Sequence, residues 1–393
     1  MRILSILTYY RPHTSGLTIY VERLATALAR RGHHVTVLTS QYDRRLPRYD
    51  RQDAVAIRRA PVLFRISKGV IMPSFGLLAA RLANQSDVIN LHLPQFDAAE
   101  AALISRLYRK PTVITYHCDL LMPPGFLSQA ANTAVHFMNQ IAASLADKIV
   151  TYTQDYADHS PYLARYRAKL HVIPPPVELP PSSPEAVEQF ARRHNPSNQR
   201  PVIGMAARFA AEKGVEVLLN AMPALLEKFP RALVLFAGMY QNIVGEQAYA
   251  ERLMPIIHQY EKQGHWKFLG NLDPIQMAAY YPNLDVIVVP SLNSTESFGL
   301  VQIEAMISGT PAVSSALPGV RQPVLTTGMG KVFPIGDSKA LAEALGAVLS
   351  NPAEYRKDST EIARRYSPDH IAAEYEDLFE SMLTKAKGGS ALH

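Results

Sequence analysis

The repeated alternation of short apolar segments with longer amphipathic ones constrains the fold of this chain more than any other feature. Residues 2–7 form an apolar strand, residues 17–31 have helical periodicity, and residues 34–39 form the next strand. A unit of this kind runs its two strands in parallel and joins them by a right-handed crossover. Similar units follow, so we expect an α/β fold whose first doubly wound domain covers residues 1–173.

A proline-rich segment interrupts this alternation. Residues 174–184 contain six prolines, which cannot continue a helix or a central strand, so we interpret the segment as a stiff linker. A second series of strands and helices follows over residues 185–366, and a last helical segment over residues 367–393. Two doubly wound domains predict a cleft between them, with ligands bound beyond the carboxyl ends of the strands.

Composition excludes several classes of protein. Hydrophobic residues make up 48% of the chain and charged residues 19%, as in ordinary globular proteins. The single cysteine, Cys118, allows no internal disulfide and suits a reducing compartment. We expect no signal peptide, and no run of about 18 apolar residues predicts a spanning helix. The expected location is therefore cytoplasmic.

The net charge of +6 is concentrated in one region, Arg44–Lys68. Its basic residues are Arg44, Arg45, Arg48, Arg51, Arg58, Arg59, Arg65 and Lys68. The region could contact a phosphorylated or lipid-linked acceptor, or the surface of an anionic membrane as a peripheral protein does, although a solvated basic face is the commoner meaning of such a cluster. No basic helix with interleaved aromatic residues occurs, so we expect no nucleic acid partner.

The strongest candidate for chemistry is the segment 294–306. It follows an apolar strand at 285–290 and places Glu296 and Glu304 eight positions apart, the first in a loop and the second two turns into a helix. The backbone N–H groups between them open a helix N-terminus, where phosphate binds favourably. Each glutamate alone is more often a loop residue or a solvated helix residue, but the whole segment favours a site for a sugar and a ribose.

Two cations lie at a second strand end. Arg208 and Lys213 are five positions apart, after the strand at 201–206 and before the next helix, so both side chains can reach one diphosphate at the helix start. In the first domain, His117 follows the strand at 112–116 and could contact a reacting sugar. A lone histidine at such a place is more often a packed or capping residue.

These residues resemble a known family. The similarity is to the retaining GT-B glycosyltransferases of glycosyltransferase family 4, and it rests on the run 22–39, the motif 208–214, the residues 268–270, the segment 296–304 and the segment 309–314. The resemblance covers nearly the whole chain and implies two doubly wound, Rossmann-like domains facing across a cleft. It also implies an acceptor-side first domain, a donor-binding second domain and a terminal helix that packs back on the first.

The resemblance implies a role for each candidate residue. Arg208 and Lys213 would bind the donor diphosphate and stabilise the leaving nucleoside diphosphate, Glu296 would bind sugar hydroxyls, and Glu304 would hold the ribose. His117 would serve the reacting sugar from the first domain. The predicted catalytic residues are thus His117, Arg208, Lys213 and Glu296, and the further donor-binding residues are Gly16, Phe268, Gly270, Ser297, Phe298, Gly299, Leu300 and Glu304.

We therefore expect a retaining glycosyltransferase that moves a sugar from a UDP- or GDP-linked donor to a glycan, lipid-linked or small-molecule acceptor. UDP-glucose, UDP-N-acetylglucosamine, UDP-galactose and GDP-mannose are all compatible with the motifs. No Asp-x-Asp tripeptide occurs, so we expect neither a metal nor another cofactor, and the cations Arg208 and Lys213 would stabilise the diphosphate charge. Two alternatives remain open: a sugar-nucleotide epimerase of similar architecture, and a nucleotide-sugar-binding protein without catalysis.

Overall fold

The computed structural model describes residues 1–66, 69–120, 126–243 and 245–389, and the chain divides into two compact units. Unit 1 comprises Met1–Pro176 together with Tyr366–His393, and unit 2 comprises Val177–Arg365. The division between the units falls within the proline-rich segment. Lys68 and the last residues of the predicted segment 367–393 lie outside the described residues.

The predicted linker 174–184 is wrong at its last residue. Pro184 is the first residue of helix α6 (Pro184–His194), and Ser183 caps that helix by accepting a hydrogen bond from the Ala186 N–H at 3.2 Å. Proline is favoured in the first turn of a helix, because its missing N–H would have no intrahelical partner there.

Unit 1 is built on an eight-stranded sheet with the order β10-β9-β8-β7-β1-β2-β4-β3. All its described pairs are parallel except β3 with β4. The strands are β1 (Arg2–Ile6), β2 (His34–Gln41), β3 (Tyr49–Gln52), β4 (Val55–Pro61), β7 (Val88–Leu93), β8 (Thr112–Tyr116), β9 (Lys148–Thr151) and β10 (Leu170–Val172). The central strands β7 and β8 are buried along their whole length, as expected for parallel strands covered on both faces. The order reverses between β1 and β7.

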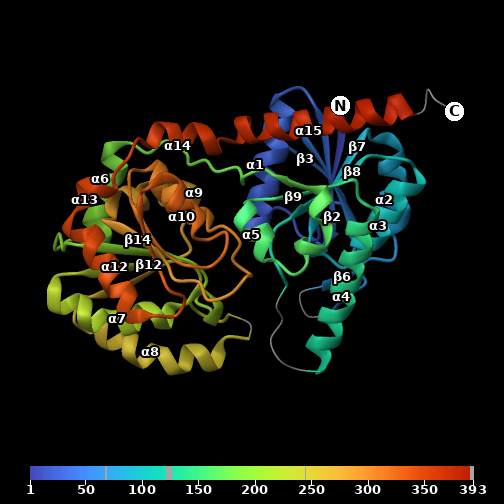
Figure 1. The fold of residues 1–393 in the computed structure, drawn as a ribbon. Helices are drawn as coiled ribbons and strands as arrows, with labels where there is room; N and C mark the ends of the chain where they lie inside the picture. The colour runs from blue at the N-terminus through green and yellow to red at the C-terminus, as the bar shows by residue number, and fades with distance from the viewer. Residues whose placement is uncertain (67–68, 121–125, 244, 390–393) are drawn as a thin grey trace. The chain divides into compact units, whose positions relative to one another are not determined.

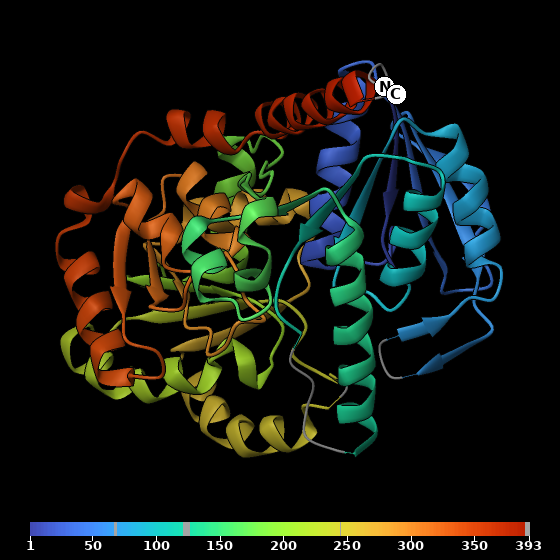
Figure 2. The same cartoon turned by 45° about the vertical axis from the view of Figure 1, so that its right-hand side comes forward.

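Helices cover this sheet in two groups. α2 (Phe75–Gln85), α3 (Ala98–Leu107) and α4 (Phe126–Leu145) pack side by side, while α1 (Gly16–Arg30) packs against α15 (Pro368–Gly389), as Figures 1 and 2 show. The Tyr375 hydroxyl of α15 lies 2.8 Å from the Tyr20 hydroxyl of α1 and 2.9 Å from Thr115 Oγ1 of β8. These buried polar contacts attach the last helix to the core of unit 1. The short helices α5 (Gln154–His159) and η1 (Leu163–Lys169) follow β9.

The Arg44–Lys68 region contains structure that the sequence analysis did not predict. β3 and β4 lie within it, and a separate antiparallel pair, β5 (Phe64–Ile66) with β6 (Gly69–Ile71), follows (Figure 2). Arginines interrupt β3, β4 and β5, and β6 has only three residues, so none of them shows the sustained apolar alternation by which a strand is recognised in a sequence.

Unit 2 contains a six-stranded, wholly parallel sheet with the order β13-β12-β11-β14-β15-β16. Its strands are β11 (Val202–Ala206), β12 (Leu233–Ala237), β13 (Trp266–Gly270), β14 (Val286–Val289), β15 (Ala312–Ser315) and β16 (Gly330–Phe333). The order reverses between β11 and β14. Ligands of open α/β sheets bind beyond the strand ends at such a reversal.

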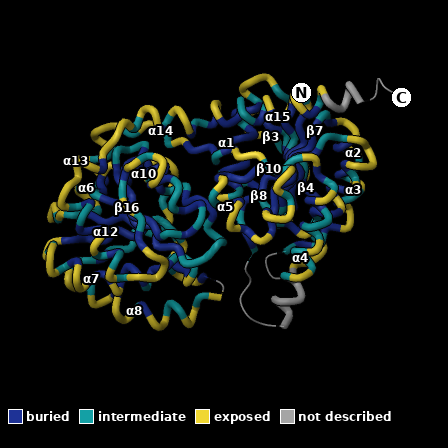
Figure 3. Tube along the Cα trace, in the orientation of Figure 1, coloured by how far each residue is buried: buried dark blue, intermediate teal, exposed yellow. Residues whose placement is uncertain are grey.

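Besides α6, which precedes β11, the described helices of unit 2 connect these strands or follow the last of them. They are η2 (Ala211–Lys213), α7 (Val215–Lys228), α8 (Gln247–Lys262), α9 (Pro274–Tyr280), η3 (Tyr281–Asn283), α10 (Leu300–Ile307), α11 (Gln322–Thr327), α12 (Ser338–Ser350), α13 (Pro352–Tyr355) and α14 (Ser359–Tyr366). In each unit the central strands are buried and most exposed residues lie on helices and loops (Figure 3). The edge strands β3 and β10 of unit 1 are largely exposed. The predicted doubly wound α/β fold class is confirmed. None of the described helices combines the length and apolar character needed to cross a membrane.

Candidate active site

The candidate site of unit 2 is built from the loops that follow β11 and β14. These strands are neighbours, with Ile203 paired to Val286 and Gly204 to Ile287, so their carboxyl ends emerge side by side at the reversal of strand order. The Leu292 N–H donates to the Glu212 carbonyl at 2.9 Å and ties the two loops together.

Gly214 is required where the first loop meets the second. Its φ is +70°, and a Cβ atom at this position would lie 1.9 Å from the carbonyl oxygen of Pro290. Only glycine permits both the left-handed conformation and this approach of backbone to backbone. The loop that carries Lys213 is thereby held against the end of β14.

Lys213 and Glu296 form the central contact of the site. Lys213 Nζ lies 2.7 Å from Glu296 Oε2, and Glu296 Oε1 accepts a hydrogen bond from the Gly299 N–H at 3.0 Å. Burial acts to lower the pKa of Lys213, but the charge and hydrogen bond of Glu296 outweigh it and leave the pKa raised. Lys213 is therefore a charged ammonium group at the strand ends.

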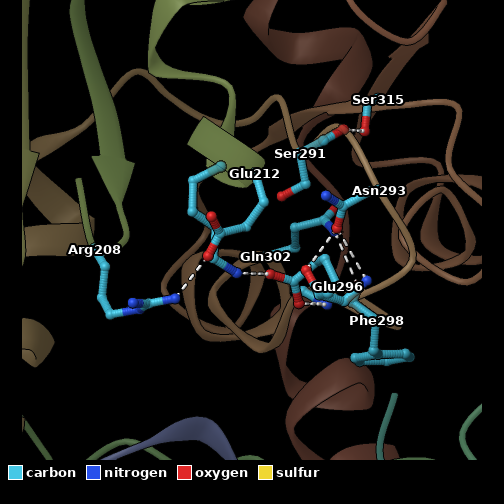
Figure 4. A network of polar contacts seen from close by, with 11 residues as sticks. Arg208, Glu212, Ser291, Asn293, Glu296, Phe298, Gln302 and Ser315 are labelled. Atoms are coloured by element: carbon cyan, nitrogen blue, oxygen red, sulfur yellow. Dashed lines mark hydrogen bonds and ion pairs between the residues drawn. The ribbon is translucent and has the colours of Figure 1, made fainter. Parts of the chain in front are cut away.

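Arg208 has its own carboxylate partner. Its Nη2 atom contacts Glu212 Oε1, as Figure 4 shows, at a distance of 2.6 Å. The Arg208 side chain remains 46% exposed. Arg208 and Lys213 were predicted to converge on one diphosphate; in this structure each is paired with a different glutamate. Glu212 was not among the predicted residues, although it stands inside the motif that contains both cations.

The start of α10 depends on Gly299. This residue has a φ of +80° and precedes Leu300, the first residue of the helix. The buried Gln302 amide holds the turn, since its Nε2 donates to the carbonyls of Phe298 at 3.1 Å and Val320 at 2.9 Å. Ser297 and Phe298 are buried as well, so the predicted donor-binding backbone from 297 to 300 is a fixed turn (Figure 4).

Glu304 lies on a buried face of α10. Its side chain accepts a hydrogen bond from the Tyr281 hydroxyl at 2.7 Å, and the residue is only 9% exposed. The interpretation of a solvated helix glutamate is therefore wrong for Glu304. Tyr281 was missed, because its sequence position, far from the helix, gives no sign of the contact.

Phe268 and Gly270 end β13, two strands away from β11. Phe268 stacks on Tyr240 with ring centroids 4.1 Å apart and an interplanar angle of 7°. Gly270 has a φ of +71° and its carbonyl accepts from the Gly238 N–H at 2.8 Å. The structure thus places an aromatic surface and a glycine turn at the carboxyl edge, apart from the Lys213–Glu296 contact.

In unit 1, His117 is buried in a chain of hydrogen bonds. Its Nε2 lies 3.0 Å from Nδ1 of His92, whose Nε2 lies 2.8 Å from Ser5 Oγ, and its Nδ1 contacts the Tyr152 hydroxyl. Burial first, and the neighbouring His92 second, lower the pKa of His117 well below its usual value. Burial likewise lowers the pKa of His92, to about 3. Both rings are therefore neutral at physiological pH.

The remaining predicted residue, Gly16, opens α1. A Cβ atom built on Gly16 would meet nothing within 4 Å, so the backbone lies open at this point. Ser15 caps the helix, with its Oγ accepting from the Thr18 N–H at 3.2 Å. Within the described part of the chain, no group of three or more His, Cys, Asp or Glu side chains is arranged to hold a metal ion.

Two family models match the chain. The model described as glycosyl transferases group 1 matches residues 187–366, and the model described as glycosyltransferase family 4 matches residues 14–179. Together they cover most of both units. The chain belongs to the family 4 group of glycosyltransferases.

Individual proteins show the same relationship. A D-inositol 3-phosphate glycosyltransferase of Xylanimonas cellulosilytica is 28% identical over 397 residues, which cover 93% of this chain and 91% of the relative. Among solved structures, sucrose-phosphate synthase from Thermosynechococcus elongatus superimposes with a TM-score of 0.77 at 22% identity, covering 98% of this chain and 99% of that one. Anabaena Alr3699/HepE, solved in complex with UDP, gives 0.74 at 20% identity, covering 97% and 100%. The fold is that of the GT-B glycosyltransferases.

Proposed function

We propose that this glycosyltransferase moves a sugar from a nucleoside diphosphate donor bound by unit 2 to an acceptor bound by unit 1, with retention at the anomeric carbon and without a metal ion. The observation that carries the proposal is the contact of Lys213 with Glu296, and of Glu296 with the Gly299 N–H, where the strand order of unit 2 reverses. A charged ammonium group beside a helix start is suited to stabilise a departing diphosphate.

The reaction breaks the bond between the anomeric carbon and a diphosphate oxygen. An acceptor hydroxyl oxygen forms the new bond to that carbon, and its proton passes to the departing diphosphate. Lys213 and Arg208 would exchange one glutamate contact each for phosphate oxygens, and the negative charge that develops would be stabilised by both cations. Glu296 would then bind sugar hydroxyls, and neither Glu296 nor Glu304 would act as an acid or base.

The donor in this proposal is UDP-linked, with GDP-mannose as the competing candidate. The Anabaena protein was solved in complex with UDP, and a further structure of that protein contains UDP-glucose. Glu304 would hold the ribose hydroxyls with Tyr281 fixing its carboxylate, and Phe268 with Gly270 would lie beside the base. His117 would face the sugar as a neutral ring fixed by His92 and Tyr152.

Peripheral contact with an anionic membrane is a further part of the proposal. Leu63 and Phe64 are 64% and 49% exposed, and Arg65 follows them in the Arg44–Lys68 region. Apolar side chains beside arginines favour binding at an acidic lipid surface. We place the enzyme in the cytoplasm, because its single cysteine, Cys118, suits a reducing compartment.

The test is a thermal-shift panel of UDP, GDP and ADP sugars, followed by turnover with the sugar that binds. The correct donor should raise the unfolding temperature, because it binds only the folded protein. NMR of the donor with and without a mixture of sugar acceptors then separates transfer from epimerisation, since an epimerase converts the donor when no acceptor is present. Activity should persist in excess EDTA. A complete loss of activity in EDTA that Mg²⁺ restores would refute metal independence, and a panel without any stabilising sugar nucleotide would refute the function.

A further inference from the structure

The structure distinguishes two kinds of arginine within the Arg44–Lys68 region. Arg45 forms an ion pair with Asp43 at 2.7 Å, and the buried Arg59 contacts Asp50 at 3.2 Å. The hydrogen bonds from Arg45 hold the pKa of Asp43 down, at about 2, so this carboxylate stays ionised and committed to its partner. These two arginines are already neutralised.

Two other arginines of the region also have partners. The Arg58 guanidinium lies over the Tyr49 ring, 5.0 Å from its centroid, and Arg65 donates to the carbonyl of Tyr42. Arg51 is exposed, and its side chain has no hydrogen bond or ion pair to any residue that the structure describes. Only part of the positive charge counted in the sequence is therefore available to a ligand.

Arg44 and Arg48 line a cavity instead. It has a volume of about 390 Å³, and the other residues on its wall are Gln41, Pro61 and Val62. No carboxylate lines this cavity, and neither guanidinium has a hydrogen bond or ion pair to any residue that the structure describes. Two unpaired guanidinium groups beside one cavity are suited to bind a phosphate group, because phosphate oxygens accept hydrogen bonds from the planar, forked donors of arginine.

The cavity lies at the functional edge of the sheet. Gln41 ends β2 and Pro61 ends β4, so the cavity lies at the carboxyl ends of these strands. His117 lies at the same edge of the sheet, because it follows the last residue of β8. β7 and β1 separate β8 from β2, so the cavity lies three to four strand spacings from β8, roughly 14–19 Å along the sheet. A phosphate attached directly to the reacting sugar would not reach that far.

An aromatic cluster lies between these two points. Tyr9 and His13, in the loop after β1, stack with ring centroids 4.9 Å apart, and Tyr42, the residue after β2, lies 5.6 Å from Tyr9 and 5.8 Å from His13. The buried Nδ1 atom of His13 has no hydrogen-bond partner among the described residues. A buried polar atom in this state has room in its hydrogen bonding for one further partner. Aromatic faces with one polar atom suit a sugar ring.

We propose that Arg44 and Arg48 bind a phosphate group of the acceptor, and that the acceptor extends from this cavity past the aromatic cluster toward His117. The acceptor is then an elongated, phosphate-bearing molecule rather than a simple sugar phosphate. This inference rests on the proposed function, because only a transferase has an acceptor. The phosphate site itself requires no turnover.

The first experiment follows the arginine Nε–H resonances of ¹⁵N-arginine-labelled protein during titration with inorganic phosphate at constant ionic strength. Excess UDP occupies any diphosphate site in unit 2, and the R44Q and R48Q variants assign the two signals. Both signals should shift together and saturate, while the paired Arg45 signal does not follow the same curve. Absence of a saturable shift, or equal shifts of Arg45 and Arg51, would overturn the proposal.

The second experiment separates a lipid headgroup from a free phosphorylated molecule. Sedimentation with vesicles of equal parts phosphatidylglycerol and phosphatidylcholine is compared for the wild type, the R44Q/R48Q variant and the R45Q/R51Q control, which loses the same charge. A loss of roughly tenfold or more confined to R44Q/R48Q identifies the lipid as the source. Equal sedimentation of all three proteins, together with the phosphate shifts, identifies a free molecule. Equal losses in both variants would mean non-specific attraction and overturn the site.

These outcomes are independent of the proposed function. A protein without transferase activity can still bind phosphate at Arg44 and Arg48, and an active transferase can fail to bind it. The two ideas can therefore be refuted separately.

Discussion

The carboxyl edges of the two sheets differ in the charge of the candidate site residues that lie there. In unit 2, charged groups face one another: Lys213 is paired with Glu296, and Arg208 with Glu212. In unit 1, His117 is a buried neutral ring whose nitrogens contact His92 and Tyr152. The strand ends of unit 2 thus carry charges that compensate one another, whereas the end of β8 in unit 1 carries a neutral ring. The unpaired charges of Arg44 and Arg48 lie further along the same edge of unit 1, at the ends of β2 and β4.

The difference indicates how each site is stabilised before a ligand binds. Cations next to each other repel, and the glutamates of unit 2 hold Arg208 and Lys213 in place until phosphate oxygens can replace the carboxylates. In unit 1 the hydrogen-bonded side chains around His117 are neutral, so no charge is buried there without a partner, which would be costly. Substitutions at both edges test this contrast.

The largest effect is expected from Lys213→Ala. Loss of the ammonium group removes charge stabilisation at the departing diphosphate, and the turnover number should fall about 100- to 1,000-fold. The exposed Lys262→Ala, on another face of unit 2, is the matched control and should behave as the wild type. Initial rates of UDP release from the donor that binds provide the measurement. Equal activity of both variants would remove Lys213 from the site.

A smaller effect is expected from Glu304→Gln. The substitution keeps the shape of the side chain but removes the charge that the ribose hydroxyls and Tyr281 bind, so the Kd for UDP should rise roughly tenfold. Tyr281→Phe, which leaves the carboxylate in place, should have a weaker effect. Titration calorimetry with UDP measures both. If Tyr281→Phe weakened binding more than Glu304→Gln did, the ribose assignment would be wrong.

The neutral histidines of unit 1 predict a pH dependence of stability. Burial lowers the pKa values of His92 and His117 in the folded protein. In the unfolded chain a histidine has a pKa of about 6.5, so below that pH the two histidines bind protons in the unfolded chain but not in the folded protein. Their contribution to stability is present above that pH and is lost as the pH falls. The free energy of unfolding should therefore rise with pH in this range. His92→Asn should reduce the slope of that rise by about 1.4 kcal/mol per pH unit between roughly pH 4 and 6.

Urea unfolding at a series of pH values measures this slope. His171→Asn, on the exposed strand β10, is measured beside it as the control for replacing a histidine by asparagine. An unchanged slope in His92→Asn would mean that His92 is protonated in the folded protein, and the contrast between the two edges would disappear.

The smallest effect is expected at Asp97, which precedes α3. Burial first, and the charge of Glu100 second, raise the pKa of Asp97 to about 7. A raised carboxyl pKa stabilises the folded protein at low pH, and this contribution is lost as the pH rises from about 4 through 7. Asp97→Asn should therefore raise the Tm above that of the wild type at pH 8, by about 2–4 °C, and not at pH 4. An equal change at both pH values would contradict the raised pKa.

Much of the fold could be predicted from local patterns. The strand at 34–39, the helix at 17–31 and the helix of residues 338–350 appear in the structure as β2, α1 and α12, with small shifts at their ends. Apolar periodicity and cap residues decide such elements, and both act over a few residues. The strands β3 to β6 are interrupted by arginine or very short and have no such pattern, so they were not predicted.

The candidate site could be predicted only in part. The motif 208–214 and the segment 294–306 were recognised, but their pairing was not, since it depends on β11 and β14 being neighbours. Tyr281 and Gln302 were missed because each acts through a contact with a segment distant in the sequence. Glu212 was missed although its partner, Arg208, is only four positions away in the same motif.

Local patterns and motifs in the sequence are sufficient to predict two doubly wound α/β units of the family 4 glycosyltransferases, because strand and helix patterns are local and motifs recur within a family. The tertiary structure alone decided that Lys213 contacts Glu296, that Glu304 is buried against Tyr281, and that Arg44 and Arg48 are left unpaired beside a cavity. Charge pairing and burial depend on which segments become neighbours in space, and a count of charges along the chain does not contain that information.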